Sequence, residues 1–229
     1  MCEESSGLRQ QQDNARMVVE PQQNLLSNND HLAGHIRKRL DSLGIRGINL
    51  MGSPGSGKTA LLEALIAQYP GGNLAELVVL EGDLATNRDA DRIQSSGVRA
   101  QQITTGSACH LSASLVAEAL IGLSLEGVKT LFIENVGNLV CPSKFAVGTH
   151  VNVVAVSIPE GDDKPIKYPV MIRAANIVVL TKADLLPHFD FDLERCRQEI
   201  HQINHHAKVL VTSAKTGEGV SELWQDLQS

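Results

Sequence analysis

The sequence predicts an α/β fold, in which a mostly parallel, doubly wound sheet carries helices on both faces. Two observations predict it. Short runs rich in Val, Ile and Leu alternate along the chain with segments of helical periodicity, which is the pattern of βαβ units. Apolar content is high but aliphatic, since 42% of the 229 residues are hydrophobic and only 3% are aromatic. Such a composition is typical of strands buried on both faces of a parallel sheet.

The chain is expected to divide into a flexible N-terminal tail, residues 1–28, and a single domain, residues 29–229. The tail is rich in Gln, Asn, Ser and Glu and shows little apolar periodicity. A helix is expected to start at the cap residues Asn29 and Asp30, because apolar residues then recur at helical spacing as far as Gly44.

From that helix onward, strands and helices alternate to the C-terminus. Apolar runs predict strands at residues 47–51, 76–83, 129–137, 151–158, 175–184 and 207–215. Helical periodicity predicts helices at residues 59–69, 87–97, 111–123, 192–204 and 219–228. This order of elements favours one parallel sheet built from successive βαβ units.

Charge and cysteine content exclude several classes of protein. A net charge of −6 without a basic run argues against non-specific nucleic-acid binding. The N-terminus does not resemble a signal peptide, and no window approaches 18 uncharged apolar residues, so we expect no membrane span. Four cysteines in a chain of this length do not indicate a disulfide framework, which favours a reducing, cytoplasmic setting.

The segment "GSPGSGKT", residues 52–59, matches the phosphate-binding loop of P-loop NTPases. It follows a predicted strand and opens a predicted helix, so its backbone N–H groups and the helix N-terminus can surround phosphate oxygens. Lys58 is expected to reach the β- and γ-phosphates, and the Thr59 hydroxyl to bind Mg²⁺. The expected phosphate-binding residues are Gly52, Ser53, Pro54, Gly55, Ser56, Gly57, Lys58, Thr59 and Ala60.

Two later motifs favour guanine as the base. "TKAD", residues 181–184, is similar to the N-K-x-D motif of GTPases, and a carboxylate at Asp184 can accept both donors on the guanine edge. "SAKTGEG", residues 213–219, resembles the loop whose backbone N–H reads the guanine O6. Thr181 stands where asparagine is usual, which puts the strength of guanine selectivity in question. The expected base-binding residues are Lys182, Asp184, Ser213, Ala214 and Lys215.

Acidic residues at two predicted strand ends are candidates for catalysis and for binding Mg²⁺. Asp83 ends one strand, and Glu134 lies three residues before Gly137, whose N–H could sense the γ-phosphate. Lys58, Asp83 and Glu134 are therefore the candidate catalytic residues, with Thr59, Asp83 and Glu134 as candidate Mg²⁺ ligands. Asp89 and Asp91 are further candidates that could equally cap a helix.

Cys109 and His110 are adjacent, and Cys141 lies just beyond the Glu134–Gly137 segment. Two thiolates and an imidazole suit Zn²⁺ or Ni²⁺ far better than Mg²⁺. With Cys141, the neighbouring pair would make a three-ligand site, whose fourth ligand could come from water, substrate or a second subunit. The sequence leaves open the alternative that the cysteines are buried structural thiols.

Over residues 30–229 the chain resembles the HypB family of hydrogenase maturation factors. The resemblance rests on the phosphate loop together with "CHLSA", "FIENVGNLVCP", "EGDDKPIKYP" and "TKADLLP". It implies a GTPase of the dimerising SIMIBI class that helps to deliver nickel to [NiFe]-hydrogenase. It also implies that Cys109, His110 and Cys141 form a metal site for Ni²⁺ or Zn²⁺ at or near a dimer interface. In the "EGDDKPIKYP" loop, Asp163 and Lys164 are expected to act at the nucleotide or across the dimer.

The sequence departs from some members of that family. It has a lone Cys2 instead of an N-terminal C-x-x-C-G-C run, and only a pair, His205 and His206, instead of a polyhistidine tract. A high-affinity nickel site near the N-terminus is therefore doubtful.

The leading hypothesis is a GTP-hydrolysing metallochaperone. It would use GTP, GDP, Mg²⁺ and Ni²⁺ or Zn²⁺ as ligands, form a GTP-favoured homodimer, and act with a nickel-delivery partner and the hydrogenase large subunit. One alternative is a GTPase switch for another metalloenzyme, such as urease or a cobalamin-dependent mutase, with structural cysteines. Another is a P-loop kinase for a small molecule, which Asp184 and the "SAK" loop disfavour.

Overall fold

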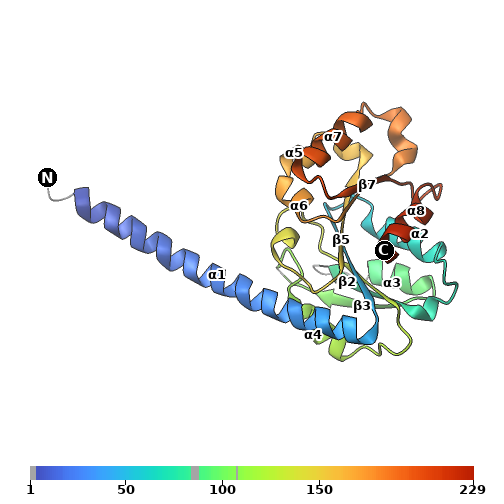
Figure 1. Cartoon of the computed structure of the whole chain (residues 1–229), viewed down its shortest axis with the longest axis horizontal. Helices are drawn as coiled ribbons and strands as arrows, with labels where there is room; N and C mark the ends of the chain where they lie inside the picture. Colours follow the sequence, from blue (N-terminus) through green and yellow to red (C-terminus); the bar gives the residue numbers. More distant parts are fainter. Residues whose placement is uncertain (1–3, 84–87, 107) are drawn as a thin grey trace.

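A seven-stranded, fully parallel sheet forms the centre of the computed structural model, which describes residues 4–83, 88–106 and 108–229 (Figure 1). The strands are β1 (Arg46–Gly52), β2 (Leu77–Asp83), β3 (Arg99–Thr104), β4 (Thr130–Glu134), β5 (Val151–Ser157), β6 (Ile177–Thr181) and β7 (Lys208–Val211). Their order in the sheet is β3-β2-β4-β1-β5-β6-β7. The predicted α/β class with a parallel sheet is confirmed.

Helices cover both faces of the sheet. They are α1 (Glu4–Leu43), α2 (Lys58–Ala67), α3 (Arg88–Ser95), α4 (Ala113–Ile121), α5 (Lys164–Lys167), α6 (Pro169–Arg173), α7 (Leu193–Ile203) and α8 (Val220–Gln228). Alternate strand residues pack against α2, α3 and α8 on one face, and against α1, α4, α6 and α7 on the other. Short 3-10 turns are η1 (Leu74–Glu76), η2 (Pro142–Lys144), η3 (Ile158–Glu160) and η4 (Ala183–His188).

The first helix differs from the sequence prediction. α1 begins at Glu4, so residues 4–28 are helical and Asn29 lies inside the helix instead of capping it. Gln is the most frequent residue there and Leu recurs, and both have good helix propensity, so the packed C-terminal half of α1 can propagate outward. The N-terminal half of α1 projects away from the sheet (Figure 1).

Two further differences concern strands. β3 is absent from the sequence prediction, because its sequence, RAQQIT, is polar and only one of its residues is buried at this edge of the sheet. β4, β6 and β7 end at Glu134, Thr181 and Val211, earlier than their apolar patterns indicate. The residues that follow leave the hydrogen-bonded ladder and form the loops at the carboxyl edge of the sheet, where ligands bind in open α/β folds.

Within the described part of the chain, no helix has both the length and the apolar character needed to cross a membrane.

Buried Asn29 fastens α1 to the domain. Its amide nitrogen donates to the carbonyl oxygen of Ala146 at 2.8 Å, and its amide oxygen accepts the N–H of Ala113, the first residue of α4, also at 2.8 Å. That N–H has no partner within its own helix, so Asn29 supplies the missing acceptor.

We therefore expect Asn29→Ala to lower the free energy of unfolding by about 1–3 kcal/mol, because the buried N–H of Ala113 loses its acceptor and the carbonyl of Ala146 loses its donor. Denaturant unfolding followed by circular dichroism measures this. Asn28→Ala makes the same substitution at the exposed neighbouring position of the same helix, so it is the matched control and should change stability by less than about 0.5 kcal/mol. Equal stability of the two variants would contradict the role given to Asn29.

Candidate functional site

A cavity of about 450 Å³ opens at the carboxyl edge of the sheet, beside the loop between β1 and α2. The phosphate-loop residues that line it are Pro54, Gly55, Gly57, Lys58, Thr59 and Ala60. The opposite wall comes from the ends of β2 and β4, from α3 and from the segment after β4. The predicted phosphate-binding loop thus lies at the edge where parallel sheets bind ligands, and the cavity is large enough for the phosphates of a nucleotide.

Glycine conformations give the loop its shape. Gly55 and Gly57 have φ angles of 75° and 86°, in the left-handed region that glycine adopts without strain. The other predicted loop residues support the loop from behind: Ser53 donates a hydrogen bond to Glu160, and the carbonyl of Ser56 accepts one from Thr181. The Nζ of Lys58 lies 3.2 Å from the carbonyl oxygen of Ser53, folded back over the loop.

Two buried glutamates face each other beside Thr59. The Thr59 hydroxyl donates to Oε1 of Glu134 at 2.8 Å, and Glu134 pairs in register with Glu81 on the neighbouring strand β2. Oε2 of Glu134 and Oε1 of Glu81 are buried without hydrogen-bond partners. Burial raises the pKa of both carboxyl groups, and the negative charge of Glu134 raises the pKa of Glu81 further.

This acidic pair fits a divalent cation. Hard oxygen ligands suit Mg²⁺, and a cation bound at these buried oxygens would offset the burial that raises the pKa of both carboxyl groups. Sequence reasoning predicted Glu134 and missed Glu81. Glu81 could have been found only by placing "LEGD" and "FIEN" side by side as the ends of neighbouring strands. The sequence does not show that β2 and β4 are neighbours.

The other acidic candidates separate in the structure. Asp83, at the end of β2, and Asp89 both line the phosphate cavity. Asp89 also forms an ion pair with Arg92, whose guanidinium binds Glu63 at 2.7 Å. Asp91 is exposed on α3 and does not line the cavity. Residues 84–87, which join Asp83 to α3, lie outside the described part of the structure.

A second cavity of about 190 Å³ adjoins the first and shares Gly57, Ala60 and Lys182 with it. Asp184, Ala214 and Lys215 also line this second cavity, as predicted for a base-binding site. Ser213 is fully buried and instead supports the site: its hydroxyl donates to Oδ1 of Asp184 at 2.7 Å, while Lys215 lies 3.8 Å from Oδ2.

Thr181, which lines the second cavity, contacts the phosphate loop. Its hydroxyl donates to the carbonyl oxygen of Ser56 at 2.6 Å, so the end of β6 is tied to the phosphate loop. Lys182 adds a second tie, since its Nζ donates to the carbonyl oxygen of Gly55 at 2.7 Å. The contact to the loop needs a short polar side chain, and the Thr181 hydroxyl provides it. Threonine nevertheless lacks the amide group that asparagine has at this position in other GTPases.

The segment after β4 is bound to the phosphate loop along its length. The N–H groups of Asn135 and Asn138 donate to the carbonyl oxygens of Leu50 and Gly52, at 2.9 and 3.1 Å. Between them, Gly137 lies so close to Pro54 that an added Cβ would be 3.0 Å from its backbone. A glycine is required there because any side chain would push the segment away from the loop.

The same segment positions Cys141. The side-chain oxygen of Asn138 accepts the N–H groups of Val140 and Cys141, at 2.7 and 3.1 Å. Asn138 is the residue whose backbone pairs with Gly52. Only a short, hydrogen-bonded turn therefore separates the Cys141 thiol from the phosphate loop.

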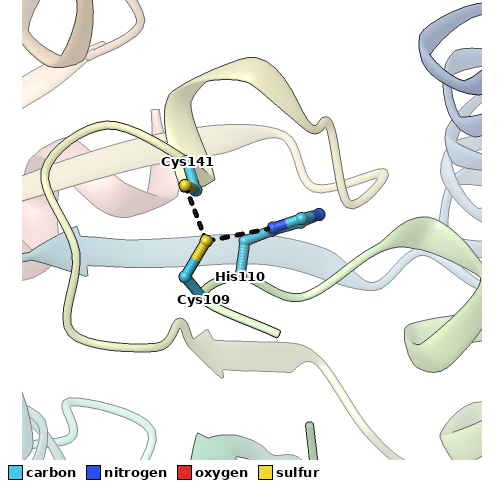
Figure 2. A group of neighbouring side chains, drawn as sticks. All are labelled: Cys109, His110 and Cys141. Atoms are coloured by element: carbon cyan, nitrogen blue, oxygen red, sulfur yellow. Dashed lines mark hydrogen bonds between the residues drawn. The ribbon is translucent and has the colours of Figure 1, made fainter. Parts of the chain in front are cut away.

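The structure brings the three predicted soft ligands together. Figure 2 shows the thiols of Cys109 and Cys141 and the imidazole of His110 converging from two loops. The ligand atoms all lie within 4.8 Å of one another, the two sulfurs are 2.7 Å apart, and Nδ1 of His110 is 3.8 Å from the Cys109 sulfur. All three residues are half-buried, so the cluster is accessible from solvent.

Neighbouring groups shift the pKa values of His110 and Cys141 in the cluster. The His110 ring stacks on Phe145 with centroids 3.8 Å apart, and burial lowers the pKa of His110. The hydrogen bond with Cys109, and then burial, raise the pKa of Cys141. At neutral pH the imidazole is therefore neutral and able to donate a lone pair, whereas the Cys141 thiol must lose a proton to become a ligand.

The "EGDDKPIKYP" loop contacts the site only indirectly. Lys164 lies 3.4 Å from Glu160, which accepts the hydrogen bond from Ser53 of the phosphate loop. Asp163 pairs with Lys167 at 2.6 Å on the surface. Neither Asp163 nor Lys164 lines either nucleotide cavity, so action directly at the nucleotide, one of the two roles expected for them, has no support within this chain.

Comparison with known proteins places this site in a family. Residues 47–211 match the family described as "CobW/HypB/UreG, nucleotide-binding domain". The chain is 46% identical, over 87% of its length, to the hydrogenase/urease maturation factor HypB of Helicobacter hepaticus, of which it covers 82%. The chain belongs to the HypB family. The resemblance predicted from the sequence is therefore confirmed.

Other HypB-family proteins extend the comparison. The chain is 48% identical to the hydrogenase maturation factor HypB of Azotobacter vinelandii over 88% of its own length, and spans 66% of that relative. The crystal structure of HypB from Helicobacter pylori in complex with nickel superposes with a TM-score of 0.83 at 41% identity, covering 88% of this chain and 94% of that one. The P-loop nucleotide-binding fold is thus shared with these HypB proteins.

Thr181→Val tests the tie between the two cavities. The substitution keeps the shape of the side chain but leaves the Ser56 carbonyl without its partner, so we expect affinity for labelled GDP to fall about tenfold. Fluorescence titration measures this. Thr181→Ser retains the hydroxyl and should bind within about twofold of the wild type; equal weakening in both variants would exclude the hydroxyl as the cause.

The raised pKa of Cys141 predicts that nickel affinity increases with pH. Below its pKa the thiol is protonated, and each proton released on binding makes the affinity rise about tenfold per pH unit. Titrations with a competing chelator at about pH 6.5, 7.5 and 8.5 measure the slope. Cys141→Ser should reduce it by one proton, whereas His110→Ala should weaken binding and keep the slope, because the pKa of His110 is already lowered. A flat profile in the wild type would contradict this.

Proposed function

We propose that this HypB-family chain hydrolyses GTP and uses its nucleotide state to hold and release nickel for [NiFe]-hydrogenase. One observation carries the proposal: the segment from Glu134 to Cys141 contacts the phosphate loop at one end and supplies a metal ligand at the other. A change at the γ-phosphate therefore displaces a ligand of the soft-metal cluster. The names of its relatives, hydrogenase maturation factors and a nickel-bound HypB, support nickel as the cargo.

Guanine is the base that fits the second cavity. Asp184 presents a carboxylate there, held by Ser213, and can accept the two donors of the guanine edge. Adenine lacks these two donors, and the lone pair on its N1 would instead face the Asp184 carboxylate, which disfavours adenine at this position. The aliphatic stem of Lys182 can cover the base.

Hydrolysis is assigned to the residues around the larger cavity. Thr59 and Glu134 would hold Mg²⁺, which supplies charge neutralisation for the β- and γ-phosphates, and Glu81 contributes a second buried oxygen next to it. Lys58 needs only to turn from the carbonyl of Ser53 to reach a phosphate oxygen. Asp83, at the cavity wall, is placed to orient the attacking water.

The metal cluster has the composition of a transfer site. Two thiolates and one imidazole leave the fourth position of a tetrahedral or square-planar ion open to water, an acceptor or a second copy of the chain. Zn²⁺ would suit the same ligands. We propose that the second copy of the chain, in a GTP-favoured homodimer, meets this face, where Val140 beside Cys141 is 45% exposed. Transfer then requires a nickel-delivery partner and the hydrogenase large subunit, in a reducing cytoplasm.

Urease is a second candidate acceptor. The Helicobacter hepaticus relative is named a hydrogenase/urease maturation factor. The same three ligands would hold nickel for either acceptor, because in this proposal the bound nucleotide controls the nickel affinity.

Nickel affinity in two nucleotide states tests the proposal. With Mg²⁺ present, we expect the dissociation constant for Ni²⁺ to differ at least about fivefold between GDP and a non-hydrolysable GTP analogue, with the dimer favoured in the latter. Metal titration and light scattering measure the two quantities. Equal affinity and equal mass in both states would overturn the proposed coupling.

A matched pair of cysteine variants identifies the ligands. The double variant Cys109→Ala with Cys141→Ala should lose nickel binding at this site. Cys196→Ala removes a thiol that is buried in α7 among apolar residues, and should bind nickel as the wild type does. If the double variant keeps its nickel, these cysteines are structural.

A further inference from the structure

A row of buried side-chain amides crosses the sheet beneath the phosphate and metal loops. Asn135, which is 1% exposed, follows Glu134 at the end of β4. Its amide nitrogen donates to Oδ1 of Asn49 at 3.2 Å, and Asn49 donates in turn to Oδ1 of Asn152 at 3.1 Å. Because an unpaired buried amide is costly, this row holds the Asn135 side chain in one orientation.

The amide oxygen of Asn135 contacts the loop that carries the upstream metal ligands. It accepts the N–H of Leu111 at 3.1 Å and the N–H of Val136 at 3.0 Å. Leu111 directly follows His110 in the chain. One side chain therefore joins the end of the strand that holds Glu134 to the loop that holds Cys109 and His110.

Leu111 packs closely against the end of β2 and against Glu134. It is fully buried, and a Cβ added to Gly82 of β2 would lie 2.8 Å from two of its side-chain atoms and 3.1 Å from the carbonyl oxygen of Glu134. The loop is thus packed on Gly82 and hydrogen-bonded to Asn135 at the same residue. A movement of Asn135 is transmitted to Leu111 because close-packed contacts do not absorb it.

The loop with Cys109 and His110 and the loop with Cys141 are therefore both hydrogen-bonded to the segment after β4, each through a different asparagine. Asn138 positions Cys141, and Asn135 positions the loop of Cys109 and His110. Both asparagines also bond through their backbone N–H groups to the β1 strand that ends in the phosphate loop.

We infer that Asn135 is a positioning residue that transmits the nucleotide state to the Cys109–His110 half of the nickel site. The inference rests on the proposed function, in which nickel affinity depends on the bound nucleotide. When residues 134–137 close on a γ-phosphate, the Asn135 oxygen carries Leu111 with it, and the distance between the ligands of the two loops changes. Without that hydrogen bond, the loop keeps its ligands but no longer follows the strand.

Three variants separate this role from a merely structural one. Asn135→Ala removes the acceptor for Leu111. Asn135→Asp keeps an oxygen that can accept the Leu111 N–H, but it loses the donor to Asn49 and adds a buried carboxyl group. Asn49→Ala breaks the row of amides on its far side, leaves the hydrogen bond to Leu111 in place, and is the matched control for lost stability.

The measured quantity is the ratio of nickel dissociation constants with GDP and with a non-hydrolysable GTP analogue. Nickel binding is followed by thiolate-to-nickel charge-transfer absorption, which also reports whether the ligands are retained. We expect the ratio of at least about fivefold to fall below about twofold in Asn135→Ala, and to stay within about twofold of the wild type in Asn135→Asp and Asn49→Ala. By linkage, nickel should also cease to alter nucleotide affinity in Asn135→Ala.

A wild-type ratio in Asn135→Ala, or an equal loss in Asn49→Ala, would overturn the inference and leave the proposed function intact. A ratio of one in the wild type would overturn the proposed function itself. Should Asn135→Ala fail to fold, Asn135→Leu removes the same acceptor for the Leu111 N–H with a side chain of similar size and shape. A reduced ratio in that variant supports the inference, and an unchanged ratio contradicts it.

Discussion

The pairing of the segment after β4 with the end of β1 is the constraint on which the site depends. Backbone hydrogen bonds from Asn135 and Asn138 fix this segment along β1 and the phosphate loop, and Gly137 allows it to touch Pro54. Parallel neighbours bring their carboxyl ends to one edge, so the phosphate loop and the acidic strand end are adjacent by topology. The loops that carry Cys109, His110 and Cys141 are hydrogen-bonded to the same segment through Asn135 and Asn138.

Electrostatics prepares the same edge for a cation and an anion together. Glu81 and Glu134 are buried side by side, and burial raises the pKa of both, so they are poorly satisfied until positive charge arrives. Lys58 is held against loop carbonyls in a position from which it can turn to a phosphate. A nucleotide phosphate bound with a divalent cation satisfies all three groups at once, which favours binding of the pair over either ion alone.

Most of the site residues could be predicted because their chemistry is carried by local motifs. The phosphate loop, the Asp184 carboxylate and the cysteine–histidine cluster each lie where the sequence indicated. Glu81 could not be found that way, since its role arises from register with Glu134 on a strand far away in the sequence. The edge strand β3 and the outward extension of α1 were missed for a related reason: neither has the apolar periodicity that a buried element shows. In the sequence, Thr181 is only a replacement for the usual asparagine of the motif. In the structure its hydroxyl donates a hydrogen bond to the carbonyl of Ser56, so the strand beside the second cavity is tied to the phosphate loop.

The sequence by itself determined the fold class, the nucleotide motifs and the types of metal ligand, because these follow from periodicity and from short runs of residues. Only the tertiary structure decided which groups lie together: the two glutamates, the two cysteine loops and the asparagine between them. The physical reason is that convergence depends on strand order and register, and a sequence pattern does not contain either.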